Sequence, residues 1–211
     1  MRTVTITIKV FKFDELSDTA KENAISRYAD TDSWSDDYQA VLRDFCDRFN
    51  VEVRRWDVSP FMPVSRSIFV YGMENPELCG LRLRTWIVNN FWYDLYEGKY
   101  YSTPFKKVRK SKKHPAGLSY RFRHSRIILD ERCLTGFCAG YTILDAIRKF
   151  LKDGWKNEPH KTWKNIVEEC VDDFFDSWKK NMEYELSKEG FSAVCEGNDY
   201  EFTEDGMLYV A

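Results

Sequence analysis

The stretch TWKNIVEECVDDFFDSWKKNMEYEL, residues 162–186, carries the longest regular pattern in the chain. Large apolar side chains recur along it at helical spacing: Trp163, Ile166, Val167, Cys170, Val171, Phe174, Phe175, Trp178 and Met182. Acidic residues crowd the opposite side: Glu168, Glu169, Asp172, Asp173 and Asp176. The pattern predicts one long amphipathic helix with a buried apolar stripe and an acidic outer face.

Shorter helices are predicted on both sides of it. Ser17 is a good N-cap for a helix that runs to Tyr28, and a broad apolar stripe predicts a second helix from Asp32 or Ser33 to Phe49. The stretch YTILDAIRKFLKDG, residues 141–154, predicts a helix that ends at Gly154. A further short helix is predicted over residues 187–196.

Alternating apolar residues predict several short strands. TVTITIKV (3–10) is typical of a half-buried strand, and VEVRRWDV (51–58), SIFVY (67–71), LRLRTWIV (81–88) and LSYRFRHSRIIL (118–129) are also predicted to be strands. The overlapping stretch WIVNNFWYDLYEG, residues 86–98, fits either a strand or a helix. We favour a helix that ends at Gly98.

The closing stretch NDYEFTEDGMLYV, residues 198–210, predicts a β-hairpin. Asp205-Gly206 suits a type I′ turn, which would set Glu204 opposite Met207 and Phe202 opposite Tyr209. Its carboxylates would then be split between the two faces, so we interpret this acidic stretch as a turn and not as an active site.

Together these patterns predict an α+β fold in one compact domain over residues 1–211. Short antiparallel strands and hairpins would pack on about four to six helices, with the long helix in the second half of the chain and the hairpin at its end. The basic segment 104–118 is expected to be the most mobile loop.

No apolar run approaches the length of about 20 residues that crosses a bilayer, and the N-terminal residues do not resemble a signal peptide. We therefore expect a cytoplasmic protein with no membrane partner, whose six cysteines are free thiols. The histidines and cysteines lack metal-ligand spacing, and no nucleotide-binding or nucleophile motif is present. We expect neither a metal nor a cofactor.

Charge is unevenly distributed along the chain. Residues 99–126 contain ten lysines and arginines and no acid, whereas residues 171–211 contain eleven acids and three lysines. The cations proposed to bind nucleic acid or a partner are Lys106, Lys107, Arg109, Lys110, Lys112, Lys113, Arg121, Arg123 and Arg126. The alternative is a solvated loop that balances the acidic tail of the same molecule.

Two further sites are candidates. The acidic face of the long helix, Glu168, Glu169, Asp172, Asp173 and Asp176, suits binding to a basic partner. Asp94, Glu97 and Lys99 resemble the carboxylate and lysine cluster of divalent-metal-dependent nucleases. Such a triplet also arises by chance in a chain this rich in charge, so we keep the nuclease as an alternative.

Four segments together resemble a family of small bacteriophage and prophage proteins that are often labelled antitoxin of a toxin-antitoxin stability system. They are FKFDELSDTAKENAISRY (11–28), CLTGFCAGYTILDAIRKFL (133–151), VDDFFDSWKKNMEYELS (171–187) and NDYEFTEDGMLY (198–209). The chain departs from the family at SPFMPVSRSIFVYG (59–72), where members carry a polar, glycine-rich segment. The family offers no established catalytic residue to carry over.

The resemblance implies an accessory protein of a phage or mobile element that works in the cytoplasm of a bacterial host. Such a protein acts by stoichiometric binding to a host protein or ribonucleoprotein. It would either inhibit a defence nuclease, as anti-CRISPR proteins do, or neutralise a toxin, as antitoxins do. The alternative functions are a DNA- or RNA-binding protein and the metal-dependent nuclease.

Overall fold

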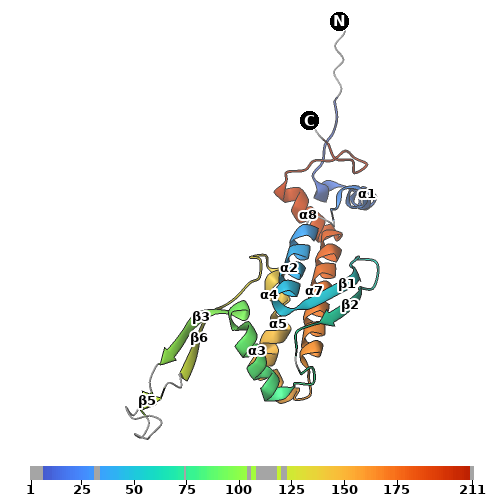
Figure 1. The fold of residues 1–211 in the computed structure, drawn as a ribbon. Helices are drawn as coiled ribbons and strands as arrows, with labels where there is room; N and C mark the ends of the chain where they lie inside the picture. Colours follow the sequence, from blue (N-terminus) through green and yellow to red (C-terminus); the bar gives the residue numbers. More distant parts are fainter. Residues whose placement is uncertain are drawn as a thin grey trace. The chain divides into compact units, whose positions relative to one another are not determined.

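The computed structural model describes residues 7–30, 34–73, 75–103, 106–107, 118–119 and 123–209, and within 98–129 it describes the backbone alone. The chain has the predicted α+β class, with helices accompanied by short strand pairs (Figure 1). Contacts divide it into a terminal unit (Met1–Ala40, Val53–Ser67, Asp172–Ala211) and a central unit (Val41–Glu52, Ile68–Val171). The expected single domain over residues 1–211 stays a prediction. None of the helices described is long and apolar enough to cross a membrane.

The long helix is confirmed as α7 (Trp163–Glu185). Every member of its predicted apolar stripe, from Trp163 to Met182, is buried. The division between the units falls between Val171 and Asp172 inside this helix. Its N-terminal half therefore belongs to the core of the central unit and its C-terminal half to that of the terminal unit.

Three phenylalanines form one core cluster of the terminal unit. The ring centroid of Phe13, in the 3-10 helix η1 (Phe13–Glu15), lies 5.1 Å from that of Phe191 in α8 (Lys188–Gly197) and 6.2 Å from that of Phe202. The predicted first helix is confirmed as α1 (Asp18–Tyr28), and the Oγ of Ser17 caps it by accepting a hydrogen bond from the Ala20 amide at 3.3 Å. The short helix expected after α7 is confirmed as α8.

Aromatic residues also pack against the C-terminal half of α7. Tyr38 stacks on Trp178 with ring centroids 4.8 Å apart, and Trp56 lies 5.8 Å from Phe175. Tyr38 comes from α2 (Ser35–Phe49), the predicted second helix, and Trp56 from β1 (Val51–Asp57). β1 pairs with β2 (Ser65–Val70), which confirms the two strands predicted in this part of the chain.

The strand predicted over residues 3–10 is wrong for the part of it that the structure describes. Residues 7–10 have no regular structure, and residues 1–6 lie outside the described residues. Phe11 forms an isolated bridge with Phe202, in which each amide donates to the other's carbonyl oxygen at 2.8 Å. A strand needs a partner over its whole length, and here the described pairing is limited to one residue.

The closing hairpin is present, but its predicted turn and register are wrong. Phe202 bridges Leu208 instead of Tyr209, and the Gly206 amide donates to the Thr203 carbonyl oxygen at 2.9 Å. Only Gly206 of the Asp205-Gly206 pair has a positive φ, +84°, whereas a type I′ turn needs two. The loop is therefore a type I turn followed by a left-handed glycine, which shifts the strand pairing by one residue.

A second strand prediction, in the central unit, is also wrong. The stretch 81–88, predicted to be β, lies in α3 (Gly80–Leu95). Leu83, Ile87, Phe91 and Leu95 follow one another at four-residue spacing, and all four are buried. The strand was predicted from the short alternation of leucine and arginine at the start of the stretch, whereas the longer helical stripe determines the structure. The helix favoured for residues 86–98 is confirmed, but it ends at Leu95 instead of Gly98.

The remaining helical segments of the central unit follow one another closely. They are α4 (Ala139–Thr142), α5 (Asp145–Lys149), the π-helical turn η2 (Phe150–Gly154) and α6 (Trp155–Asn157). The helix predicted over 141–154 is thus broken into pieces and continues beyond Gly154. Ile143, Leu144, Ile147 and Phe150 are buried. In the same core Phe91 stacks on Trp163 of α7, with ring centroids 5.4 Å apart.

Candidate nucleic-acid interface

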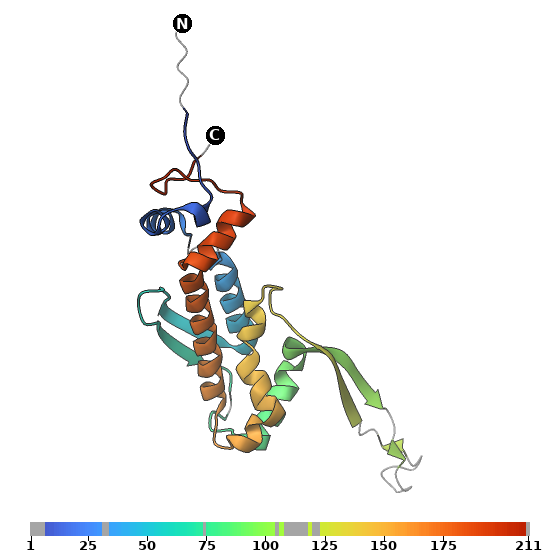
Figure 2. The same ribbon diagram turned by 180° about the vertical axis from the view of Figure 1, so that it is seen from behind.

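The described part of the basic stretch lies in short antiparallel strand pairs. β3 (Tyr96–Thr103) pairs with β6 (Arg123–Glu131) in a two-stranded ribbon, from Tyr96 opposite Glu131 to Thr103 opposite Arg123. Two-residue strands, β4 (Lys106–Lys107) and β5 (Leu118–Ser119), pair beyond them. Figure 2 shows β3 and β6 side by side, with β3 continuing directly from α3. The strand predicted over 118–129 is confirmed in its described part.

The described backbone positions five of the basic residues. Lys99 lies opposite Ile127, Arg126 opposite Tyr100, and Arg123 opposite Thr103. Lys106 lies opposite Ser119 and Lys107 opposite Leu118. The other predicted contact residues, Arg109, Lys110, Lys112, Lys113 and Arg121, lie outside the described residues, as does most of the segment 104–118.

Arg132 ties the base of the ribbon to the end of α3. Its amide donates to the Leu95 carbonyl oxygen at 3.0 Å, and its Nη1 donates to the Tyr93 carbonyl oxygen at 2.6 Å. Its Nε also lies 4.0 Å from Oε1 of Glu97. The strand register shifts between Glu97 and Gly98, so a β-bulge lies beside this attachment. Bulges of this kind bend a strand pair and set the direction in which it leaves its base.

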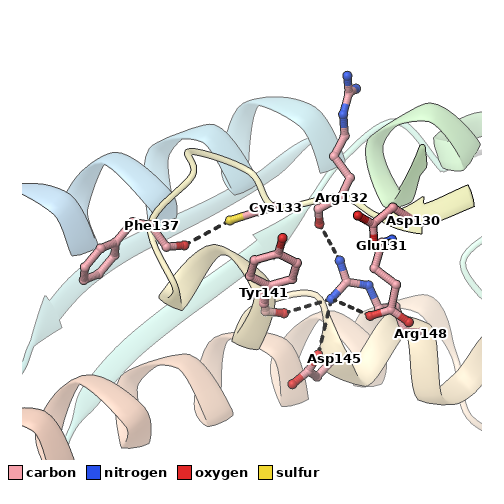
Figure 3. Close-up of polar contacts among 8 residues, drawn as sticks. All are labelled: Asp130, Glu131, Arg132, Cys133, Phe137, Tyr141, Asp145 and Arg148. Carbon is pink, nitrogen blue, oxygen red and sulfur yellow. Dashed lines mark hydrogen bonds and ion pairs between the residues drawn. The ribbon is translucent and has the colours of Figure 1, made fainter.

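The side chain of Arg148, in α5, also contacts the base of the ribbon (Figure 3). Its side chain is 7% exposed, and its Nη2 donates to the carbonyl oxygen of Arg132. Nη1 lies 3.2 Å from the Tyr141 carbonyl oxygen, 3.4 Å from Asp145 Oδ1 and 3.5 Å from Glu131 Oε2. Both terminal nitrogens of this buried guanidinium therefore contact oxygen atoms, and these contacts offset much of the cost of burying the charge.

Arg148 is the residue that pattern reading missed. It lies in the apolar stripe of its segment, three residues before Leu151 and four after Leu144, both of which are buried. An arginine at such a position indicates a buried cation that needs partners. Those partners come from the end of β6, the residue after it and the neighbouring helical segments, so the sequence pattern does not reveal them.

The proposed nuclease residues do not form a metal cluster among the described side chains. Oδ1 of Asp94 lies 3.2 Å from Nη1 of Arg48. The Nε of the same arginine donates a hydrogen bond to Asp44. Glu97 faces Arg132, and of Lys99 the backbone alone is described. Within the described residues no group of three or more histidine, cysteine or acidic side chains could hold a metal ion. A catalytic role for Asp94, Glu97 and Lys99 stays a hypothesis.

The acidic face of α7 is partly neutralised within each unit. In the central unit Glu168 lies 3.7 Å from Lys164, and Glu169 pairs with Lys161 and lies 4.0 Å from Lys149. In the terminal unit Asp172 pairs with Arg66, while Asp173 and Asp176 are exposed. Glu168, Glu169 and Asp172 therefore have cationic partners among the described residues.

No family model matches the chain, and neither a curated protein nor a solved structure matches it at a significant level. The resemblance to phage proteins labelled as antitoxins is therefore an expectation from the four quoted segments. Function has to be argued from the ribbon, its base and the surrounding charges.

Proposed function

We propose that this protein acts by stoichiometric binding and that its target is a nucleic acid or a host nucleoprotein, contacted by the β3–β6 ribbon. One observation carries the proposal: five of the ten cations in the acid-free stretch 99–126 lie in paired antiparallel strands, three on β3–β6 and two on β4–β5. The proposed place of action is the cytoplasm of a bacterial host, in line with the resemblance to phage accessory proteins.

The physical fit supports this choice. The major groove of duplex DNA, about 12 Å wide, admits a two-stranded ribbon, and lysine and arginine gain affinity by displacing counterions from phosphates. A ribbon whose base is held by Arg132 and Arg148 has less freedom to lose on binding than an unpaired loop.

The acidic face of α7 is the second candidate contact, as a toxin neutraliser would use it against a basic partner. The exposure of Asp176 favours it, but Glu168, Glu169 and Asp172 of this face already form ion pairs within the chain. Solvent-exposed acids also bind weakly on their own. The acid-free basic stretch, residues 99–126, therefore ranks first.

The direct test is fluorescence anisotropy of labelled duplex DNA, single-stranded DNA and RNA, titrated with the full chain at several salt concentrations. We expect binding whose logarithm falls linearly with the logarithm of salt concentration. No binding to any of the three at low salt, together with no nucleoprotein recovered from a bacterial lysate, would rule the proposal out.

The same samples test the nuclease alternative. The protein is incubated with each nucleic acid in Mg²⁺ or Mn²⁺, and the products are separated on a denaturing gel. Under the binding proposal the strands stay intact. Metal-dependent cleavage that disappears in Glu97→Ala and persists in Glu77→Ala, an exposed control, would replace the binding proposal with the enzymatic one.

A further inference from the structure

A pocket of about 420 Å³ lies in the central unit beside the base of the ribbon. Its walls come from α3, from the α5–η2 segment, and from Tyr96 and Glu131, the first pair of the ribbon. Pockets that hold small organic ligands have volumes of about 300 to 1,000 Å³. This one is large enough for a ligand of the size of a mononucleotide.

Helical spacing brings its wall residues together. Arg84, Val88 and Trp92 are four residues apart on α3 and share one face of that helix. On the other wall, Arg148 and Lys152 have the same spacing.

A hydrogen bond joins the two walls: Nε of Arg84 donates to the Leu151 carbonyl oxygen at 3.1 Å. Leu151 belongs to the π-helical turn η2, and π-helical turns are frequent at functional sites.

The charges around the pocket favour an anion. Its described lining has one carboxylate, Glu131, and four cations: Arg84, Arg148, Lys149 and Lys152. Glu131 and Asp145 partly offset the charge of Arg148, and Glu169 lies 4.0 Å from Lys149. Arg84 and Lys152 form no ion pair with a carboxylate that the structure describes. Two cations are thus left to attract a phosphate.

The floor of the pocket favours an aromatic group next to that anion. Trp92 and Tyr96 contribute their rings, whose centroids are 4.9 Å apart. Burial raises the pKa of the Tyr96 phenol, and the nearby Glu131 carboxylate raises it further, so the hydroxyl keeps its proton and can donate. The Nε of Arg148 is buried and has no hydrogen-bond partner among the described residues.

We propose that this pocket binds a nucleotide, with the phosphate on Arg84 and Lys152 and the base against Trp92 and Tyr96. That chemistry is shared by a free nucleoside 5′-monophosphate and by the 5′-terminal nucleotide of a strand. The pocket cations whose side chains the structure describes lie on α3 and on the α5–η2 segment, whereas the ten cations of residues 99–126 belong to the ribbon stretch. Either proposal can therefore fail while the other stands.

The test is calorimetric titration of the full chain with 5′-AMP and 5′-UMP, with adenosine and inorganic phosphate as partial ligands. We expect saturable binding of at least one nucleotide with a Kd below about 1 mM, and binding of each partial ligand at least about tenfold weaker. No saturable binding of either nucleotide, or inorganic phosphate binding as tightly as the nucleotides, would overturn the proposal.

Matched variants locate the site. Arg84→Ala and Lys152→Glu are each expected to weaken nucleotide binding at least about tenfold, a change of about 1.4 kcal/mol. Arg82→Ala, an exposed arginine on the same helix and outside the pocket, is the control and should bind as the parent does. Lys152 is exposed, so its variant keeps the test decisive even where Arg84→Ala folds poorly. Equal affinity in Lys152→Glu and Arg82→Ala would contradict the assignment.

Competition distinguishes the two nucleotide sources. Displacement of the bound nucleotide by a 5′-phosphorylated oligonucleotide but not by its 5′-hydroxyl form assigns the pocket to a strand end, and no displacement by either assigns it to the free nucleotide. Equal displacement by both forms would argue against phosphate recognition. The double variant Lys106→Ala/Lys107→Ala should keep nucleotide affinity unchanged, which separates this site from the ribbon.

Discussion

Nη2 of Arg148 donates a hydrogen bond to the carbonyl oxygen of Arg132, the residue that directly follows strand β6. The backbone amide of Arg132 is in turn bonded to Leu95, the last residue of α3. One buried side chain thus links α5 to the base of the basic ribbon. The stability of that base and the function of the ribbon are therefore expected to depend on Arg148.

Replacing Arg148 should loosen the base of the ribbon. Arg148→Met keeps much of the apolar stem but removes every guanidinium hydrogen bond, and we expect the free energy of unfolding to fall by about 2–4 kcal/mol. Urea denaturation followed by circular dichroism measures the loss, and hydrogen exchange should show reduced protection of the Arg132 amide. Arg82→Met, an exposed control, should stay within about 0.5 kcal/mol of the parent. Equal losses in the two variants would refute the role of Arg148.

Gly206→Ala should destabilise the terminal unit. A Cβ at Gly206 would come within 2.2 Å of the Ala20 carbonyl oxygen, and φ is already +84°. We expect the free energy of unfolding to fall by about 3 kcal/mol or more, from the left-handed backbone and the clash together. Gly136→Ala is the matched control, because its φ is +83° and no atom lies within 4 Å of its added Cβ. It should lose about 1–2 kcal/mol in the same urea experiment. A smaller loss for Gly206→Ala than for Gly136→Ala would contradict the packing against α1.

Cys195 should make stability fall at alkaline pH. Burial, with a contribution from Asp14, raises the pKa of this thiol from 9.0 to about 11. Between those values the unfolded chain loses the proton that the folded chain keeps, so the free energy of unfolding decreases as pH rises, by at most about 1.4 kcal/mol per pH unit. Below pH 9 the thiol is protonated in both states and has no effect. Urea midpoints at pH 7, 9 and 10.5 should fall less steeply in Cys195→Ala than in the parent; parallel curves would show that the thiol does not contribute.

Neutralising the ribbon should reduce the salt dependence of nucleic-acid binding. Lys106→Ala/Lys107→Ala removes two potential phosphate contacts, so the slope of log K against log salt concentration should become less negative by up to about 2. Lys156→Ala/Lys180→Ala removes the same charge from exposed positions outside the ribbon and should leave the slope close to that of the parent. Anisotropy titrations from low to moderate salt measure both slopes. Identical slopes in the two double variants would remove these lysines from the interface.

Predictions that rested on a pattern repeated over many residues, or on a local hydrogen bond, were confirmed. The apolar stripe of α7 extends over its whole length, and Ser17 caps α1 by a local hydrogen bond, so both could be predicted without tertiary contacts. Two of the short patterns gave wrong predictions. Leucine and arginine alternate at residues 81–84, but the buried stripe from Leu83 to Leu95 makes the segment helical. At Asp205-Gly206 the turn signal was right and its type was wrong, because only the glycine takes a positive φ.

The sequence by itself determined the α+β class, the long helix and the segregation of charge, because composition and helical periodicity are local properties of the chain. Only the tertiary structure decided that five of the basic residues lie in paired strands, that Arg148 holds the base of the ribbon, and that Arg84 and Lys152 line one pocket. Those relationships join residues that lie far apart in the chain. They arise when buried polar groups find partners and helices pack together, and no pattern within one segment specifies them.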